Sequence, residues 1–153
     1  MRKIAAILSL AVLFLAGCAS PQPAAATPPA ENSPAGTDQE INILLRKTGG
    51  FAGVDESWEV ASDGHITTSE GESAQVSAAE LSRTVSELEE LGFFDLQASY
   101  VPHDTCCDRF TYQLEVTVNG KPHSVTVLEA TPGTPDGFWQ ALDVVNSLLV
   151  SVK

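Results

Sequence analysis

The strongest constraint on the fold of this chain is an alternating segment, residues 110–118, that stops at Asn119-Gly120. Apolar residues occupy every second position, which is typical of a strand with one buried face. Asn-Gly is the dipeptide that most favours a two-residue type I′ turn, and a turn of that length fixes the register of the two strands that it joins. The predicted pairs are Val118 with Lys121, Val116 with His123, Leu114 with Val125, and Tyr112 with Val127.

Two other segments have the spacing of helices with one apolar face. The first begins with Ser77 and Glu80, which have the spacing of a capping box, and Gly92 stands where a left-handed residue ends a helix. The second is expected to use Thr134 as its N-cap and Pro135 as its first residue. The apolar stripes consist of Leu81, Val85, Leu88 and Leu91 in the first helix and of Phe138, Leu142, Val145, Leu148 and Leu149 in the second.

Three strands are predicted before the first helix. Residues 41–48 alternate in polarity, Gly49-Gly50 interrupts the pattern, and residues 51–61 carry a second strand. Residues 62–64 then form a turn into a third strand at residues 65–68. The order of strands, helix, hairpin and helix predicts an α+β domain, an antiparallel β-sheet with two helices packed on its apolar face.

The first residues of the chain predict export and lipidation. Arg2 and Lys3 precede an apolar run that is too short for a bilayer span, which needs about 20 residues. Leu15-Ala16-Gly17-Cys18 resembles the lipobox of bacterial lipoproteins, which implies cleavage before Cys18 and acylation of its thiol. We therefore expect residues 1–17 to be a lipoprotein signal peptide and the protein to be lipid-anchored in the cell envelope, facing away from the cytoplasm. The alternative is an ordinary secretory signal, with Cys18 there by chance.

Residues 18–40 are expected to be a tether, because prolines recur among Ala, Ser and Thr without apolar periodicity. Residues 41–153 are long enough for one hydrophobic core and too short for two domains. Loss of Arg2 and Lys3 with the signal leaves six Lys and Arg residues against 20 Asp and Glu residues, a net charge of −14. A chain this acidic repels nucleic acid, so we expect no nucleic-acid partner, and lipid rather than charge would hold the chain at a membrane.

Three stretches resemble emfourin, a bacterial family of proteinaceous inhibitors of thermolysin-like zinc metallopeptidases. They are Thr48-Gly49-Gly50-Phe51-Ala52-Gly53, Leu91-Gly92-Phe93-Phe94-Asp95-Leu96 and Asp108-Arg109-Phe110-Thr111-Tyr112. The resemblance covers nearly all of residues 41–153 and implies a small α+β protein that blocks a secreted or periplasmic metallopeptidase by reversible binding. The tether and the segment around Tyr100 to Cys107 depart from the family pattern.

The segment from Gly49 to Gly53 is the candidate partner-binding site, made of Gly49, Gly50, Phe51, Ala52 and Gly53. Its glycines permit unusual backbone angles and close approach of another chain. The family implies a preference of the target for a bulky apolar residue next to the cut bond, which Phe51 would supply. The alternative is that Phe51 turns inward as part of the core and the glycines form a bulge or turn.

Cys106 and Cys107 are the only thiols left once Cys18 is acylated. Export favours a vicinal disulfide between them, although adjacent Cα atoms about 3.8 Å apart lie below the usual disulfide range and make such a bridge comparatively easy to reduce. A metal site with His103 and Asp108 is a weaker alternative, because adjacent cysteines are poorly spaced for tetrahedral ligation. A redox-sensing loop or an intermolecular bridge are further alternatives.

The sequence contains no recognisable catalytic motif, neither His-Glu-x-x-His nor Gly-x-Ser-x-Gly, and the histidines at 65, 103 and 123 are scattered. We therefore expect a binding protein without enzymatic activity, metal or cofactor. The leading hypothesis is a membrane-tethered metallopeptidase inhibitor. The alternative is a non-inhibitory lipoprotein that binds or assembles other envelope components.

The predicted lipid anchor is tested by Cys18→Ser. Serine cannot carry the thioether-linked diacylglycerol, and two or more acyl chains are needed for stable anchoring. We expect the variant to leave the membrane fraction or to stall in processing. Full processing with unchanged membrane retention would contradict the lipoprotein prediction.

Overall fold

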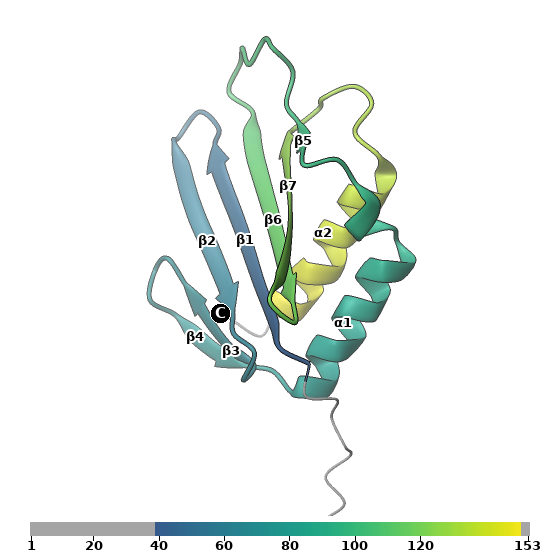
Figure 1. Ribbon diagram of the computed structural model, residues 1–153. Coiled ribbons are helices and arrows are strands. Elements are labelled where there is room, and N and C mark those ends of the chain that lie inside the picture. The colour runs from purple at the N-terminus through teal and green to yellow at the C-terminus, as the bar shows by residue number, and fades with distance from the viewer. Residues whose placement is uncertain (1–38, 151–153) are drawn as a thin grey trace, which may run out of the picture. The chain divides into compact units, whose positions relative to one another are not determined.

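A computed structural model describes residues 39–150 of the chain (Figure 1). The predicted signal peptide, Cys18 and nearly all of the predicted tether lie outside these residues, as do residues 151–153. Within the described range, no helix has the length and apolarity needed to cross a membrane. The elements are β1 (Ile41–Gly49), β2 (Val54–Val60), β3 (His65–Thr68), β4 (Ser73–Gln75), α1 (Ala78–Glu90), the short 3-10 helix η1 (Phe93–Asp95), β5 (Ser99–Tyr100), β6 (Phe110–Val118), β7 (Lys121–Leu128) and α2 (Asp136–Leu149).

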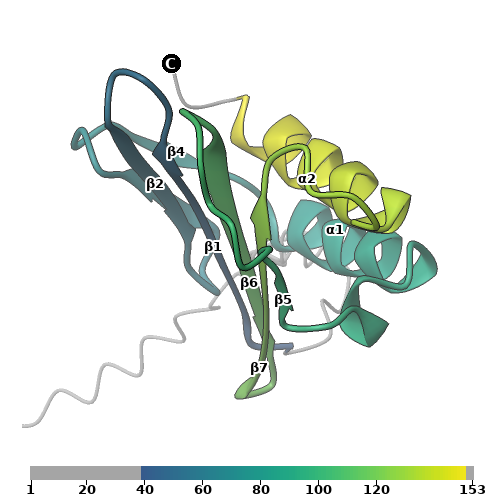
Figure 2. The same cartoon turned by 90° about the horizontal axis from the view of Figure 1, so that it is seen from above.

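The strands form one sheet in the order β4-β3-β2-β1-β6-β7-β5. All neighbouring strands are antiparallel except β5 and β7, which run parallel. Both helices pack on the same face of the sheet (Figure 2). The predicted α+β fold with two helices on one apolar face is thus confirmed, with one parallel pair at an edge.

The core lies between the sheet and the two helices. Alternate residues of β1 and β6 point inward because a strand places successive side chains on opposite faces. The side chains that are almost fully buried there include Ile41, Ile43 and Leu45 of β1, Leu114 and Val116 of β6, Leu81, Val85 and Leu88 of α1, and Phe138, Ala141 and Val145 of α2.

The hairpin of β6 and β7 has the predicted register. Val118 pairs with Lys121 across the turn, and the other three predicted pairs are also present. Asn119 and Gly120 both have positive φ, 51° and 73°, as a type I′ turn requires. The alternation and the turn dipeptide therefore determine this part of the sheet together.

The ends of α1 are those that the sequence predicts. The Ser77 hydroxyl accepts a hydrogen bond from the Glu80 N–H at 3.2 Å, and the Glu80 carboxylate accepts one from the Ser77 N–H at 2.8 Å. The Ser77 hydroxyl also donates to this carboxylate at 2.7 Å, and the two hydrogen bonds that the carboxylate accepts from Ser77 lower the pKa of Glu80. Gly92 has φ 70°, in the left-handed region, and directs the chain into η1.

The start of α2 corrects the prediction by one residue. Pro135, not Thr134, is the N-cap, and the helix begins at Asp136. The Thr134 hydroxyl donates instead to the Thr131 carbonyl at 3.0 Å, closing a turn before the helix. Proline still supplies the fixed φ that suits a helix entry, but it stands outside the first turn.

Other strand predictions need correction. Residues 51–53 form a turn, so the second strand begins at Val54 rather than at Phe51. Two strands were not predicted, β4 and β5, with three and two residues. These short strands are the two edges of the sheet, and the part of β7 that β5 does not cover begins with Lys121 and Pro122.

The capping box provides a test of the fold. Ser77→Ala removes the side-chain acceptor for an N–H of the first turn, so the free energy of unfolding should fall by about 1 kcal/mol. Ser86→Ala is the matched control, because Ser86 is exposed in the middle of α1 and alanine has the higher helix propensity. Urea unfolding measures both variants. An equal effect of the two substitutions would contradict the role assigned to the cap.

Candidate functional site

Three loops lie at one end of the sheet (Figure 1). The strand register places them there: Gly49 at the end of β1 pairs with Phe110 at the start of β6, and Thr111 pairs with Leu128 at the end of β7. The loops are the β1–β2 turn (residues 50–53), the β5–β6 loop (101–109) and the β7–α2 connection (129–135). We call these three segments the loop end. Two of the three stretches quoted from the sequence, 48–53 and 108–112, therefore meet here.

Phe51 stands at the tip of the β1–β2 turn with its side chain in solvent. Its exposed fraction is 93 %, the highest among the large hydrophobic residues described as exposed. The turn is closed by a hydrogen bond from the Gly53 N–H to the Gly50 carbonyl at 3.1 Å. The alternative that Phe51 belongs to the core is wrong, because nothing covers its ring.

Glycine is required at the base of this turn. Gly49 has φ 98°, and a Cβ there would lie 2.6 Å from the Arg109 carbonyl oxygen. Gly50 has φ 68°, and a Cβ there would lie 2.5 Å from the Phe110 ring. Gly53 also has positive φ, 66°, but open space surrounds it. The first two glycines thus let the turn lie directly against the start of β6.

A salt bridge joins the two strands just below the turn. The Arg46 guanidinium on β1 donates to both carboxylate oxygens of Asp55 on β2, each at 3.0 Å. These hydrogen bonds lower the pKa of Asp55, and both side chains remain solvent-exposed. The pair favours the hairpin geometry, although screening by solvent keeps its contribution small.

Arg109 connects all three loops. Its carbonyl accepts a hydrogen bond from the Gly50 N–H at 3.1 Å, which attaches the β1–β2 turn. Its guanidinium donates to the carbonyls of Asp104 and Cys106 in its own loop, both at 3.3 Å, and to the carbonyl of Glu129 at 3.2 Å. The sequence motif includes Arg109 but gives no sign of this role, because its partners are backbone carbonyls up to 20 residues away.

Glu129 of the β7–α2 connection and Phe110 at the start of β6 are joined by two hydrogen bonds. The Glu129 N–H donates to the Phe110 carbonyl at 2.8 Å, and the Phe110 N–H donates to the Glu129 carboxylate at 3.3 Å. The Lys47 ammonium lies 4.2 Å from the centre of the Phe110 ring, a cation–π contact. Burial, together with the negative charge of Glu129, raises the pKa of Tyr112. These contacts hold in place the start of β6, which lies directly against the β1–β2 turn.

Cys106 and Cys107 are exposed in the β5–β6 loop, with their Sγ atoms 2.6 Å apart. Cys107 has φ 81°, in the left-handed region, and its carbonyl accepts a hydrogen bond from the Arg109 N–H at 2.8 Å. The hydrogen bond with Cys106 and the charge of that neighbour raise the pKa of Cys107. The two sulfurs are free thiols in this structure, and the predicted disulfide between them stays a prediction.

The metal site considered from the sequence is not assembled. Across residues 39–150, no group of three or more His, Cys, Asp or Glu side chains is arranged to hold a metal ion, and this includes His103 and Asp108 beside the cysteines. His65 is exposed at the start of β3. His123 pairs with Val116 as predicted, and its buried Nε2 has no hydrogen-bond partner.

The third stretch, residues 91–96, has a structural role away from the turn. Phe93 is completely buried, and its ring contacts those of Phe94 and His123 edge to face, with centroids 5.4 and 5.2 Å apart. The Leu91 carbonyl approaches the start of α2 so closely that a Cβ at Gly137 would lie 2.8 Å from it. This stretch therefore packs the end of α1 against the start of α2.

The comparisons with known proteins agree with the resemblance carried by these stretches. The family model of Emfourin matches residues 45–136. The chain belongs to the Emfourin family. This is a family of metallopeptidase inhibitors. A search of curated proteins found no match to the chain at a significant level.

The Emfourin match includes the whole loop end and ends where α2 begins. It also contains Cys106 and Cys107, so the two thiols lie inside the family domain. The match begins within β1, after the predicted tether. The two quoted stretches that meet at the loop end, 48–53 and 108–112, thus lie inside the matched region.

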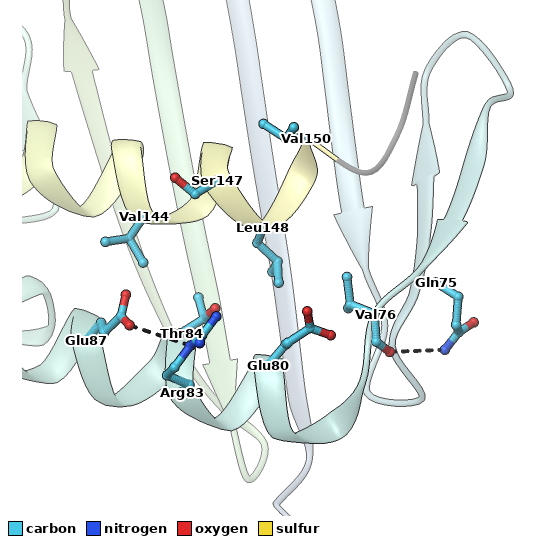
Figure 3. Close-up of a pocket in the computed structure, with 10 residues that line it drawn as sticks. All are labelled: Gln75, Val76, Glu80, Arg83, Thr84, Glu87, Val144, Ser147, Leu148 and Val150. Carbon is cyan, nitrogen blue, oxygen red and sulfur yellow. Dashed lines mark hydrogen bonds and ion pairs between the residues drawn. The ribbon is translucent and has the colours of Figure 1, made fainter.

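The Emfourin domain also has a groove between its two helices, drawn in Figure 3. Its volume is about 380 Å³, and it opens beside the start of α1 and the end of α2. Val76, Val144 and Leu148 supply apolar surface, while Arg83 and Glu87 of α1 form an ion pair at 3.7 Å along its rim. None of the residues predicted to form the binding site lines this groove.

The requirement for glycine at the base of the turn is testable. Gly53→Ala should cost only the penalty of a left-handed alanine, about 1–2 kcal/mol of unfolding free energy. Gly49→Ala should cost at least about 1 kcal/mol more, because the Arg109 carbonyl must also move and weaken its bond to Gly50. Denaturant unfolding of the two variants checks this difference. Equal losses of stability would show that the close contact with Arg109 does not constrain the turn.

Proposed function

We propose that this protein is a membrane-tethered inhibitor of a thermolysin-like zinc metallopeptidase and acts by reversible binding. The observation that carries the proposal is Phe51, a large apolar side chain held in solvent at the tip of a glycine-shaped turn. Membership of an inhibitor family supports inhibition as the activity. In this proposal the loop end is the surface that contacts the enzyme. The partner is a secreted or periplasmic enzyme whose binding cleft accepts a bulky apolar group.

The turn suits an inhibitor because it is already held in one conformation. Hydrogen bonds within the turn and to Arg109 fix its backbone, so little conformational entropy remains to be lost on binding. Burial of a phenylalanine side chain stabilises a complex by about 2–3 kcal/mol. A contact of ordinary size buries roughly 1,200–2,000 Å², and its energy concentrates in a few such anchors.

The pairing of the strands beside the turn favours binding without cleavage. Gly49 and Val54 form the last pair of the β1–β2 ladder, and Gly49 also pairs with Phe110 on the other side. A peptidase that binds its substrate as an added strand needs free backbone N–H and C=O groups. Here those groups on the β1 side are already in the sheet, so drawing this segment into the enzyme would break the central ladder.

The predicted lipid anchor would hold the inhibitor at the membrane. If residues 18–40 are extended at about 3.1 Å per residue, the domain reaches up to about 70 Å from the membrane. An inhibitor held in that layer would meet secreted peptidases before they reach envelope proteins. We therefore propose protection of the cell envelope as its biological role.

Phe51→Ala tests the contact. Purified residues 41–153 should inhibit a thermolysin-like peptidase encoded by the same organism, and the variant should bind at least about tenfold more weakly, about 1.4 kcal/mol. Its melting temperature should stay near the wild-type value, because the ring contacts no core residue. Inhibition constants and thermal unfolding measure the two effects.

Val150→Ala is the matched control. Val150 is also an exposed apolar residue, 63 % accessible, but it follows α2 and lies outside the loop end. Its truncation should leave the inhibition constant unchanged. Failure of the wild-type domain to slow such peptidases at micromolar concentration would overturn the inhibitor proposal and favour the non-inhibitory envelope protein.

A further inference from the structure

The two adjacent thiols of the β5–β6 loop face each other in solvent. Cys106 and Cys107 are both exposed, and their sulfurs are 2.6 Å apart, so they can be joined without moving either residue far. The Cys106 N–H donates to the Asp104 carboxylate at 3.0 Å, which holds the backbone that carries the pair. The pair is therefore open to a small reagent from solvent.

The same pair is two hydrogen bonds away from the turn that carries Phe51. The Arg109 N–H binds the Cys107 carbonyl, the Arg109 side chain binds the Cys106 carbonyl, and the Arg109 carbonyl binds the Gly50 N–H. A change in the backbone at 106–107 thus reaches Gly50 through one residue.

We propose that Cys106 and Cys107 form a thiol–disulfide exchange site, and that its oxidation state controls how firmly the Phe51 turn is held. The co-reactants are low-molecular-weight disulfides and thiols of the glutathione class. The consequence for partner binding rests on the proposed inhibitor function, whereas the exchange chemistry and its effect on the turn do not.

The exchange proceeds in two balanced steps. The Cys106 sulfur, as thiolate, attacks one sulfur of the external disulfide, forms a mixed disulfide and expels one external thiolate. Cys107 then gives its proton to the first expelled thiolate and attacks the Cys106 sulfur, closing the vicinal bond and expelling the second external thiolate, which takes up the proton that Cys106 released. The external disulfide is reduced to two thiols, and the protein dithiol is oxidised by two electrons.

Closure of the ring restricts the loop. It removes the rotamers in which the two sulfurs point apart, so the backbone at 106–107 is held in the shape that Arg109 contacts. Fewer loop conformations mean less frequent opening of the Arg109 contacts. In the oxidised protein the hydrogen bond from the Gly50 N–H to the Arg109 carbonyl should therefore open less often than in the reduced protein.

Mass spectrometry and amide hydrogen exchange test this proposal without a peptidase. The protein used is residues 18–153 with Cys18→Ser, which leaves the pair as its only thiols. Oxidised glutathione should lower the intact mass by about 2 Da without a lasting adduct, and reduced glutathione should reverse the change. Exchange of the Gly50 amide should be at least about fivefold slower in the oxidised form, while that of Val116 in central β6 stays the same.

Two variants separate the chemistry from the coupling. Cys107→Ser should retain a glutathione adduct on Cys106 and show no vicinal bond. Arg109→Ala should still form the vicinal bond, but the oxidised and reduced forms should differ by less than about twofold in Gly50 exchange. If Arg109→Ala loses the protection of the Val116 amide, Arg109→Lys is used in its place. Lysine keeps the charge without the planar set of donors.

Each outcome tests a different part of the proposal. Absence of the 2 Da shift overturns the exchange site, and equal Gly50 exchange in the two forms of the wild-type chain overturns control of the turn. Persistence of the full difference in the Arg109 variants overturns the route through Arg109. Any of these results leaves the inhibitor proposal standing, and a failure of inhibition leaves this chemistry standing.

Discussion

The structure depends on the pairing of β1 with β6 at the centre of the sheet. Nine residue pairs, from Ile41 with Val118 to Gly49 with Phe110, join segments that lie more than 60 residues apart in the chain. Closing so long a loop costs entropy, which the buried apolar side chains on the inner face of both strands offset. The same ladder places the β1–β2 turn beside the start of β6. The ladder that buries the core thus also positions the loop end.

Local signals were enough to predict those parts of the fold that local interactions determine. The register of residues 110–127 follows from alternation and Asn119-Gly120, and the ends of α1 follow from Ser77, Glu80 and Gly92. The two edge strands could not be predicted in this way. β5 contains two residues that pair with β7 in parallel, which leaves no periodicity to detect. The exposure of Phe51 could not be predicted from the sequence either, because an apolar residue between glycines fits a buried bulge and an exposed turn equally well.

The candidate site illustrates the same division. The segment from Gly49 to Gly53 was identified through the family resemblance, and its glycines and Phe51 were compatible with a binding role. In the structure Gly49 and Gly50 lie directly against Arg109 and Phe110 of another quoted stretch. What the sequence did not reveal is how this segment is held. Arg109 acts through backbone carbonyls, which have no residue-specific signature, and Glu129 is supplied by a third loop. Because the acceptors are main-chain carbonyls, side-chain changes at Asp104, Cys106 or Glu129 would leave these acceptors in place, whereas the arginine itself is required.

The short outer strands have a consequence for the protein at high concentration. A sheet can recruit another chain wherever it offers a long row of unpaired backbone donors and acceptors. Here β4 provides three residues and β5 two, and the uncovered start of β7 carries a lysine followed by a proline that lacks an N–H. A second copy would find only short edges, one of them interrupted by a proline, along which to extend the sheet. Strand addition is therefore disfavoured as a route to self-association of the described domain, even where many copies lie close together.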